Sequence, residues 1–299
     1  MSAGPSSPRP STFEDGLRLA VGTLSVLPVR SPGVVDRRAA GIAMTAAPLV
    51  GALLGAIGAA VLAAALWAGV SPLPASVLAV GSLALLTRGL HLDGLADLAD
   101  GLGSGRPADR ALEIMKRSDI GPFGVATLVL TLLLQVAALE EAASAGLGPV
   151  SLVTACAAGR LALTWACLPS VPPARPDGLG ATVAGTVRLG AALAVTAPVL
   201  AGVTALAYGV ARRGPYGVAE QGPYVVPWGW FAPAVLAGLL AAWALRRRAV
   251  RRLGGVTGDV LGALVEVAAT AALLVCAAVA VAATAYNGGV NCSPCAGRV

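Results

Sequence analysis

The sequence predicts an all-α protein, a polytopic helix bundle that is integral to a membrane. Of its 299 residues, 57% are hydrophobic and 12% are charged, and the mean hydropathy is +0.79. This composition departs from the soluble average in the direction typical of membrane proteins. The apolar runs are long, continuous and rich in Ala and Leu, which argues against alternating transmembrane strands. We therefore expect one transmembrane helical domain over residues 17–286, with about seven spans.

The apolar runs give the expected elements in chain order. Residues 1–16 begin with a segment rich in Pro and Ser, so we expect a disordered cytosolic tail there. Residues 17–29 are apolar but too short to cross a bilayer, which predicts a short interfacial or re-entrant helix. A short C-terminal tail, 287–299, follows the last span. The expected spans are 40–70, 73–86 (a marginal one), 123–139, 149–168, 189–210, 228–245 and 260–286.

Short basic runs between these spans predict the orientation of the bundle. Cytoplasmic loops of membrane proteins carry an excess of Lys and Arg, so the loops 88–122 and 175–188 are expected inside. The N-terminus then lies inside and the C-terminus outside, with Arg212 and Arg213 as the one exception to the charge rule. Because the basic residues report topology, the net charge of +6 does not call for a nucleic-acid partner.

Three aspartates in the stretch 91–101 are the strongest candidates for chemistry. In a helix Asp93, Asp97 and Asp100 stand at i, i+4 and i+7, within roughly 60° of one another, while His91 lies on the opposite side. Like charges this close repel unless a cation, retained protons or water reaches them. Oxygen ligands of this kind suit Mg²⁺ or Mn²⁺ better than Zn²⁺. The alternative is a solvated acidic loop between two helices.

A second acidic motif opens the last expected span, over residues 254–266. Asp259 and Glu266 stand at i and i+7, on one helical face, with Gly262 between them to allow close approach of a helix or ligand. In a purely structural interpretation, Thr257 or Asp259 would be a helix N-cap. That interpretation leaves Glu266, two turns inside an apolar helix, unexplained.

Basic residues complete the set of candidates. The stretch 110–124 places Lys116 and Arg117 close to carboxylates before a Gly-Pro turn, as a phosphate-handling site requires. Its alternative is a juxtamembrane helix with surface salt bridges. Arg160 lies within an apolar segment, so we expect it to face the bundle interior beside an anionic partner, or else to snorkel. The stretch 175–180 is typical of a turn.

The cysteines carry little functional signal. Cys156, Cys167 and Cys276 lie in apolar spans and are expected to be packing residues. Cys292 and Cys295 form a CxxC near the C-terminus, which two cysteines alone cannot turn into a zinc site. A local disulfide or no function is the expectation for that pair.

Several of these motifs together resemble the cobalamin synthase family. The resemblance rests on HLDGLADLADG, EIMKRSDIGPFG, the Gly-Arg pair that ends at Arg160, RPDGLGA and GGVTGDVLGALVE, and it extends from the span that begins at Ala40 to the last one. The acidic run and the GGxTGDxLGAxxE run are specific to that family. One departure is that the family commonly has K-D-S-R before Ile-Gly, whereas this chain has Lys116-Arg117-Ser118-Asp119, with acid and base exchanged.

The resemblance implies a Mg²⁺-dependent membrane transferase that completes the lower ligand of cobalamin. Adenosylcobinamide-GDP would be joined to α-ribazole or its 5′-phosphate, with release of GMP, at the cytoplasmic side of a bacterial plasma membrane. The partners implied are these substrates, the lipid bilayer and, as an open possibility, further copies of the chain. The expected metal ligands are Asp93, Asp97 and Asp100. The expected catalytic residues are these three with Asp259 and Glu266, and the expected substrate-binding residues are His91, Glu113, Lys116, Arg117 and Arg160.

Other functions compete with this interpretation. CDP-alcohol phosphotransferases also bind metal through aspartates at a membrane face, but their full motif spacing is not reproduced here. A cation transporter could use the same acids, although transporter sites usually lie near the bilayer midplane and these acids cluster at the ends of spans. A structural membrane subunit would not need five carboxylates on one side.

Overall fold

The computed structural model describes residues 10–213 and 228–290, and this part of the chain is entirely helical apart from turns and loops. Six of its helices are long and apolar enough to cross a membrane, or seven if the bent pair α3 and α4 counts as one span, which confirms the expected polytopic bundle. The elements are α1 (Phe13–Leu24), α2 (Arg37–Trp67), α3 (Pro72–Leu86), α4 (Leu90–Gly103), α5 (Ala108–Ile114), α6 (Pro122–Ser144), α7 (Gly148–Ala166), α8 (Gly178–Val183), α9 (Leu189–Arg213), the 3₁₀ turn η1 (Trp228–Trp230), α10 (Phe231–Leu253) and α11 (Gly258–Val290).

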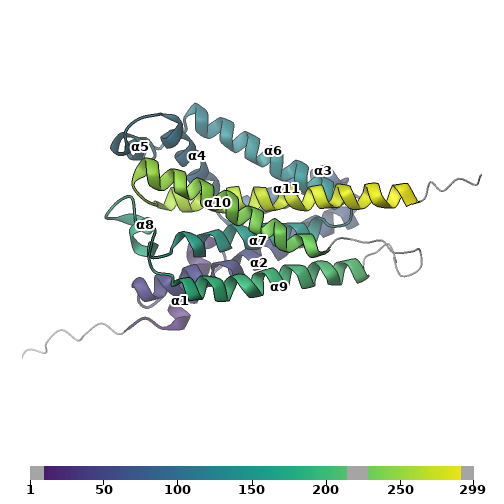
Figure 1. Cartoon of the computed structure of the whole chain (residues 1–299), viewed down its shortest axis with the longest axis horizontal. Helices are drawn as coiled ribbons and strands as arrows, with labels where there is room; N and C mark the ends of the chain where they lie inside the picture. The colour runs from purple at the N-terminus through teal and green to yellow at the C-terminus, as the bar shows by residue number, and fades with distance from the viewer. Residues whose placement is uncertain (1–9, 214–227, 291–299) are drawn as a thin grey trace, which may run out of the picture.

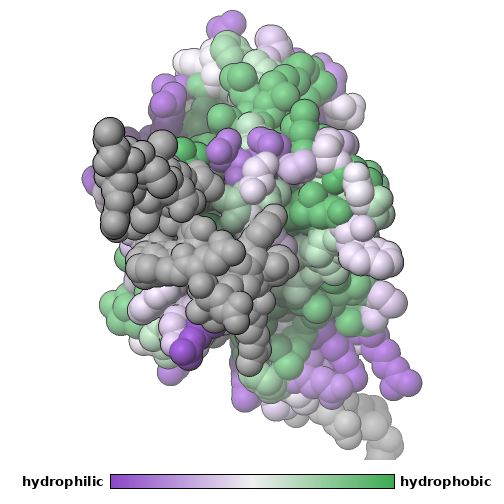
Figure 2. Space-filling model, turned by 90° about the vertical axis from the view of Figure 1, so that its right-hand side faces the viewer, coloured by the Kyte–Doolittle hydropathy of each residue, from purple (hydrophilic) through white to green (hydrophobic). Residues whose placement is uncertain are grey.

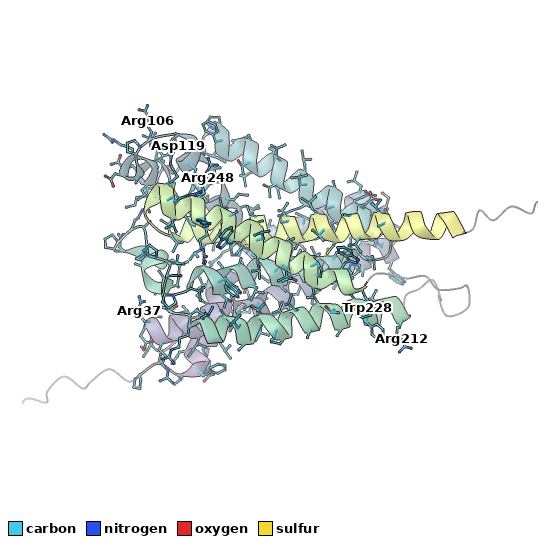
Figure 3. The ribbon with its side chains drawn as sticks, viewed as in Figure 1. Arg37, Arg106, Asp119, Arg212, Trp228 and Arg248 are labelled. Carbon is cyan, nitrogen blue, oxygen red and sulfur yellow. The ribbon has the colours of Figure 1, made fainter. Side chains whose placement is uncertain are left out.

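The long helices run side by side and alternate in direction, so that their ends gather at two opposite ends of the molecule (Figure 1). The short helices α4, α5 and α8 lie at the end where α2, α6, α9 and α11 begin. Arg37, Arg106, Asp119 and Arg248 lie at this same end (Figure 3). We call it the arginine-rich end.

Aromatic residues mark the opposite end of the bundle. Trp67 closes α2 with 91% of its surface exposed, and Trp228 and Trp230 form the exposed turn before α10. Tyr208 packs edge-on against Trp228, with ring centroids 5.5 Å apart. Viewed onto this end, apolar residues are prominent on the surface and hydrophilic residues form separate patches (Figure 2). Trp and Tyr with this placement are typical of a membrane–water interface.

The first helix begins earlier than the sequence interpretation expected. Thr12 and Asp15 form a reciprocal capping box, in which each side chain bonds the backbone N–H of the other, and the helix therefore starts at Phe13 within the expected tail 1–16. It ends at Leu24, well before Pro28. At the other end of the chain α11 extends to Val290, past the expected limit of 286. Cys292 and Cys295 lie outside the described residues.

A sharp corner separates α3 from α4. Arg88 and Gly89 both have left-handed backbone conformations, with φ of 54° and 66°, and the two helix axes differ by 87°. Gly adopts this conformation without strain, whereas Arg does so rarely. The expected marginal span 73–86 therefore continues into a helix that turns across the bundle. Because α4 packs against the starts of α6 and α11, it lies at the arginine-rich end, and it is not one of the six spanning helices.

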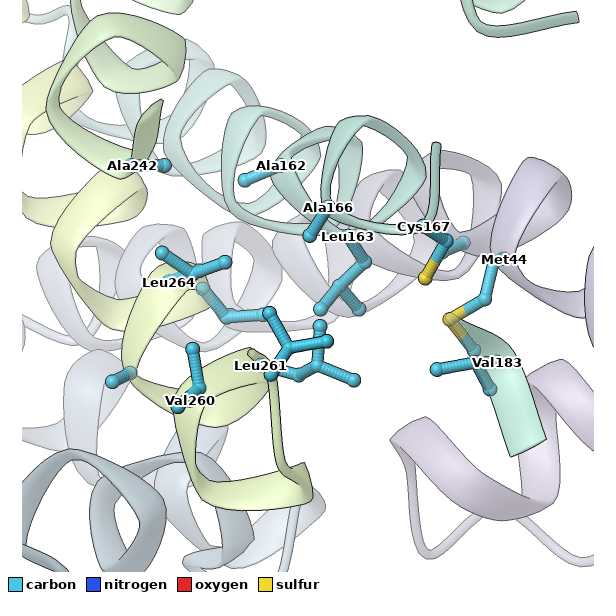
Figure 4. Packing of buried hydrophobic residues seen from close by; sticks show 14 of the residues in the cluster. Met44, Ala162, Leu163, Ala166, Cys167, Val183, Ala242, Val260, Leu261 and Leu264 are labelled. Carbon is cyan, nitrogen blue, oxygen red and sulfur yellow. The ribbon is translucent and has the colours of Figure 1, made fainter. Parts of the chain in front are cut away.

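The core is built around α7, whose 18-residue apolar window is 83% buried. Small side chains such as Ala162 and Ala166 let α10 and α11 approach it closely, and Leu163, Leu261 and Leu264 fill the space between them (Figure 4). Cys156, Cys167 and Cys276 are free and buried, which confirms their expected role in packing. This core fixes where the first turns of α4 and α11 meet.

Candidate functional site

The acidic stretch forms the helix α4, and its first turns lie directly against the start of α11. A Cβ atom at Gly94 would lie 2.8 Å from the carbonyl oxygen of Asp259 and 2.9 Å from its Cα, closer than real side chains approach. On the other helix, a Cβ at Gly262 would lie 3.2 Å from the Cα of His91. Glycine at these two positions therefore allows the close contact of α4 with α11.

This contact places two of the expected catalytic residues at one cavity. Asp93 and Asp259 both line a space of about 190 Å³, which we call the aspartate cavity. Thr23 and His91 are its other polar wall residues, and the rest of its wall is apolar or Gly, contributed by α1, α2, α4, α7, α8 and α11. Asp93 is exposed and Asp259 is half-buried, so the cavity is open to solvent at its acidic side. The structure thus brings together acids from two motifs that are more than 150 residues apart.

Asp97 lies one turn beyond Asp93 and experiences the charge of the whole group. Partial burial, followed by the nearby carboxylates of Asp93, Asp259 and Asp100, raises the pKa of Asp97 from 3.8 to about 7. The guanidinium of Arg175 opposes this shift. Burial and the neighbouring carboxylates therefore disfavour the charged form of Asp97.

Arg175 lies close enough to lower the pKa of Asp97 and Asp259, although it does not line the aspartate cavity, and the sequence interpretation did not include it among the site residues. Its loop is held by backbone hydrogen bonds in both directions between residues 172–174 and Val256, directly before α11. Its Nη2 donates to the carbonyl oxygen of Leu112 at 2.6 Å, which connects the loop to α5. In the sequence, Arg175 opens the motif RPDGLG, which by itself is typical of a turn but is also one of the motifs that carry the family resemblance.

Asp100 has a different environment from the other two aspartates of α4. Its buried carboxylate accepts hydrogen bonds from the backbone N–H groups of Gly121 at 2.7 Å and Gly124 at 2.9 Å. These are orphan donors at the start of α6, so Asp100 caps that helix. The three aspartates share one helical face, as expected, but they have different neighbours. Asp93 and Asp97 lie near Asp259, whereas Asp100 bonds the start of α6.

The chemistry of this donor set fits a divalent cation, although the side chains do not converge on one point. Within residues 10–213 and 228–290, no group of three or more His, Cys, Asp or Glu side chains is arranged to hold a metal ion. The oxygens of Asp93, Asp97 and Asp259 are nevertheless the hard ligands that Mg²⁺ prefers, and their mutual repulsion is what such an ion relieves.

Glu266 lies in a second, separate space deeper in the bundle. It is seven residues beyond Asp259, about 10 Å along the helix axis. Its Oε2 accepts a 2.8 Å hydrogen bond from Nε2 of Gln135, which also bonds Oγ1 of Thr270 at 3.0 Å. Glu266 and Gln135 line a small cavity of about 40 Å³, with Arg160 on its wall. The shared helical face of Asp259 and Glu266 therefore does not bring Glu266 into the aspartate cavity.

His91 and Arg160 connect the two cavities. His91 lines the aspartate cavity, Arg160 lines the smaller one, and the two side chains are in contact. The Nη2 atom of the buried Arg160 is 3.4 Å from Nδ1 of His91. Because a guanidinium can only donate, Nδ1 accepts and the imidazole is neutral, with its proton on Nε2. We expected an anionic partner for Arg160, and its hydrogen-bond partner among the described residues is this histidine. Its Nε has none there, and the adjoining cavity exceeds the roughly 10–15 Å³ that a water molecule requires.

The remaining predicted residues lie on the surface around α5. Glu113 pairs with Arg110 at 2.6 Å, and both side chains are exposed, as the salt-bridged alternative for this stretch supposes. Lys116 and Arg117 are exposed in the turns after α5, and neither lines the aspartate cavity. Met115 packs against Gly101 of α4, so this segment adjoins the acidic helix.

Comparisons with known proteins agree over most of the chain. The family described as cobalamin-5-phosphate synthase matches residues 16–277. A protein of Frankia casuarinae named adenosylcobinamide-GDP ribazoletransferase is 49% identical over 270 residues, which cover 87% of this chain and 93% of that protein. Proteins of the same name from Nocardioides sp. and Bradyrhizobium diazoefficiens are 42% and 38% identical, and their alignments cover 89% and 88% of this chain and 100% and 93% of those proteins. No solved structure matches the chain.

Proposed function

Because this chain belongs to the cobalamin-5-phosphate synthase family, we propose that it joins adenosylcobinamide-GDP to α-ribazole or α-ribazole 5′-phosphate and releases GMP. The observation that carries the assignment of the site is the contact of α4 with α11 at Gly94, which sets Asp93 and Asp97 beside Asp259. The relatives with this activity by name align over nearly the whole chain, so neither a CDP-alcohol phosphotransferase nor a cation transporter is favoured.

The proposed reaction is a phosphoryl transfer at a diphosphate. A ribose hydroxyl of the ribazole attacks the phosphorus that is joined to cobinamide, and a new P–O bond forms. The bond from that phosphorus to the bridging oxygen breaks, and GMP leaves with this oxygen. A carboxylate of the aspartate cavity accepts the hydroxyl proton, and Arg175 stabilises negative charge on the phosphates.

The size of the aspartate cavity indicates which part of the substrate it takes. Its volume of about 190 Å³ is smaller than the roughly 300–1,000 Å³ of cavities that enclose a drug-sized ligand. We infer that it receives the reacting diphosphate and the attacking ribose hydroxyl, while the corrinoid ring stays outside it. The exposure of Asp93 leaves the acidic side of the cavity accessible for this purpose.

We propose that the site requires Mg²⁺, held by Asp93, Asp97 and Asp259. The support for this is the hard oxygen donor set and the raised pKa of Asp97, which reflects partial burial first and the neighbouring carboxylates second. When bound, the ion would neutralise non-bridging oxygens of the diphosphate. Asp100 is left out of this set because its carboxylate is bonded to the start of α6.

We also propose that the arginine-rich end faces the cytoplasm of a bacterial plasma membrane. The support is the positive-inside rule, applied to the arginines that gather at this end. In this orientation the aspartate cavity opens toward the compartment that holds nucleotide substrates.

An assay of the purified protein tests this function. The protein in detergent is given adenosylcobinamide-GDP with α-ribazole, or with its 5′-phosphate, and GMP release and the cobalamin product are quantified with Mg²⁺ and with excess chelator. We expect both products in equal amounts and only with the ion. GMP release without a cobalamin product would contradict the transfer, and equal rates in chelator would contradict the metal requirement.

A further inference from the structure

A long groove follows the outer surface between α2 and α9, away from the aspartate cavity. Its mouth, of about 510 Å³, lies between α1, α2 and the first turns of α9 at the arginine-rich end. A second space of about 550 Å³ continues along α2, α7 and α9. Thr45, Leu49 and Val195 line both spaces, so the two form one groove. None of its wall residues lines the aspartate cavity.

The mouth of this groove is positively charged. Arg37, Arg38 and Arg188 line it, and none of its described wall residues is Asp or Glu. The guanidinium of Arg37 is fixed by hydrogen bonds to the carbonyl oxygens of Ala181 at 3.2 Å and Ala184 at 2.7 Å. Arg38 and Arg188 are exposed, and neither belongs to an ion pair in the described part of the chain.

The carboxylate nearest to this mouth in the sequence forms no ion pair with its arginines in the described part of the chain. Asp36 precedes Arg37, but its oxygens accept hydrogen bonds from Oγ of Ser11 at 2.6 Å and from the backbone N–H of Ala39 at 2.7 Å. It is thereby used as the N-cap of α2. The exposed guanidinium groups remain available for an anion, and Arg suits the oxygens of a phosphate.

Beyond its mouth the groove is apolar and faces the region of the bilayer. Its walls there are small or aliphatic, and they include Ala52, Pro198, Gly202 and Leu206. From Leu189 to Leu206 the helix α9 rises about 26 Å, which exceeds the depth of one leaflet in a hydrocarbon core of roughly 30 Å. The helix α9 is also the least buried of the spans, with 11% of its apolar window buried.

We propose that this groove binds an anionic phospholipid, with its phosphate at Arg38 and Arg188 and one acyl chain along α9. A free phosphate would account for the arginines but not for the apolar groove that continues from them. A second copy of the chain would account for the apolar part but would not require an acid-free arginine mouth. A phospholipid of the leaflet nearest the arginine-rich end satisfies both features at once.

The test compares lipids and paired variants on the full chain. The protein is delipidated in neutral detergent, titrated with phosphatidylglycerol or phosphatidylcholine, and examined by native mass spectrometry and by thermal melting. We expect preferential retention of phosphatidylglycerol and a higher melting temperature with it. The double variant Arg38→Gln/Arg188→Gln should bind about 30-fold more weakly, from the loss of two charges near an anionic headgroup. Arg248→Gln/Arg251→Gln removes two exposed arginines of α10 at the same end and should bind normally.

A second pair of variants tests the apolar part. A Cβ at Gly202 or at Gly209 meets nothing within 4 Å, so Leu fits either position of α9 without a clash at its Cβ, but only Gly202 lines the groove. Gly202→Leu should displace the lipid and Gly209→Leu should not. Three results would overturn the proposal: equal retention of both lipids in all variants, complete displacement by inorganic phosphate, or a dimer in detergent that Gly202→Leu converts to a monomer.

Discussion

The carboxylate of Asp100 accepts a 2.7 Å hydrogen bond from the backbone N–H of Gly121 and so joins α4 to the first turn of α6. Asp100→Asn keeps the shape of the side chain but replaces one acceptor with a donor, which leaves a buried N–H unpaired. We expect a loss of about 1–2 kcal/mol in stability, seen as a lower melting temperature. The Mg²⁺ concentration for half-maximal activity should stay unchanged. A marked rise in that concentration would indicate that Asp100 is a metal ligand after all.

Gly94 controls the approach of α4 to α11. In Gly94→Ala the new Cβ would meet the backbone of Asp259 at 2.8–2.9 Å, so the two helices must separate and the aspartates must move apart. We expect a large loss of kcat with a smaller loss of melting temperature. Gly81→Ala on α3 is the matched control, since its Cβ meets nothing within 4 Å, and it should be neutral or slightly stabilising. A normal kcat in Gly94→Ala would show that catalysis does not need the close contact of α4 with α11.

Asp97 gives a pH-dependent prediction for the metal-free protein. Its pKa is raised from 3.8 to about 7, so the folded state is penalised for ionising this group, and stability is lost as pH rises from about 4 through 7. Asp97→Asn removes the penalty. In chelator the variant should melt above the wild type at pH 8, and the difference should shrink toward pH 4. An equal difference at both pH values would contradict a raised pKa of Asp97 as the cause.

We expect Glu266 to affect activity by positioning its neighbours and not by contacting the reacting groups. It lines the same small cavity as Arg160, which contacts His91 at the start of α4. Glu266→Gln should therefore lower kcat while the Mg²⁺ dependence stays unchanged. The exchange Glu266→Gln/Gln135→Glu keeps one carboxylate and the hydrogen bond between these two positions, and it should recover activity to within about threefold of wild type. No recovery, together with an altered Mg²⁺ dependence, would indicate direct contact of Glu266 with the reacting groups.

The fold could be predicted from the sequence because membrane spans are local signals. Apolar runs of sufficient length and basic runs between them located the spanning helices, although α6 and α10 end about five and eight residues beyond the expected limits 139 and 245. Helical spacing placed Asp93 and Asp97 on one face of α4. The start of α1 was missed by four residues because the capping box of Thr12 and Asp15 is a local signal that hydropathy ignores.

The site was only partly predictable, because spacing along one helix does not reveal which neighbour each residue meets. Nothing in the run 91–101 indicates that Asp100 would bond the start of α6, since that depends on how α6 packs. Arg175 reaches the site only through the backbone pairing of its loop with Val256, a contact between segments about 80 residues apart. Glu266 shares a helical face with Asp259, but α6 and α7 enclose it at a different depth.

Catalysis at the aspartate cavity requires Asp93 and Asp259 to act as one unit, and a double-mutant cycle measures this directly. GMP release is followed against Mg²⁺ concentration for Asp93→Asn, Asp259→Asn and the double variant, with the exposed Asp109→Asn as control. We expect each single variant to lose about 100-fold or more in kcat with a raised Mg²⁺ requirement, and the double variant to be little worse than either. Losses that multiply in the double variant, or near-normal rates in both single variants, would contradict a shared site at the aspartate cavity.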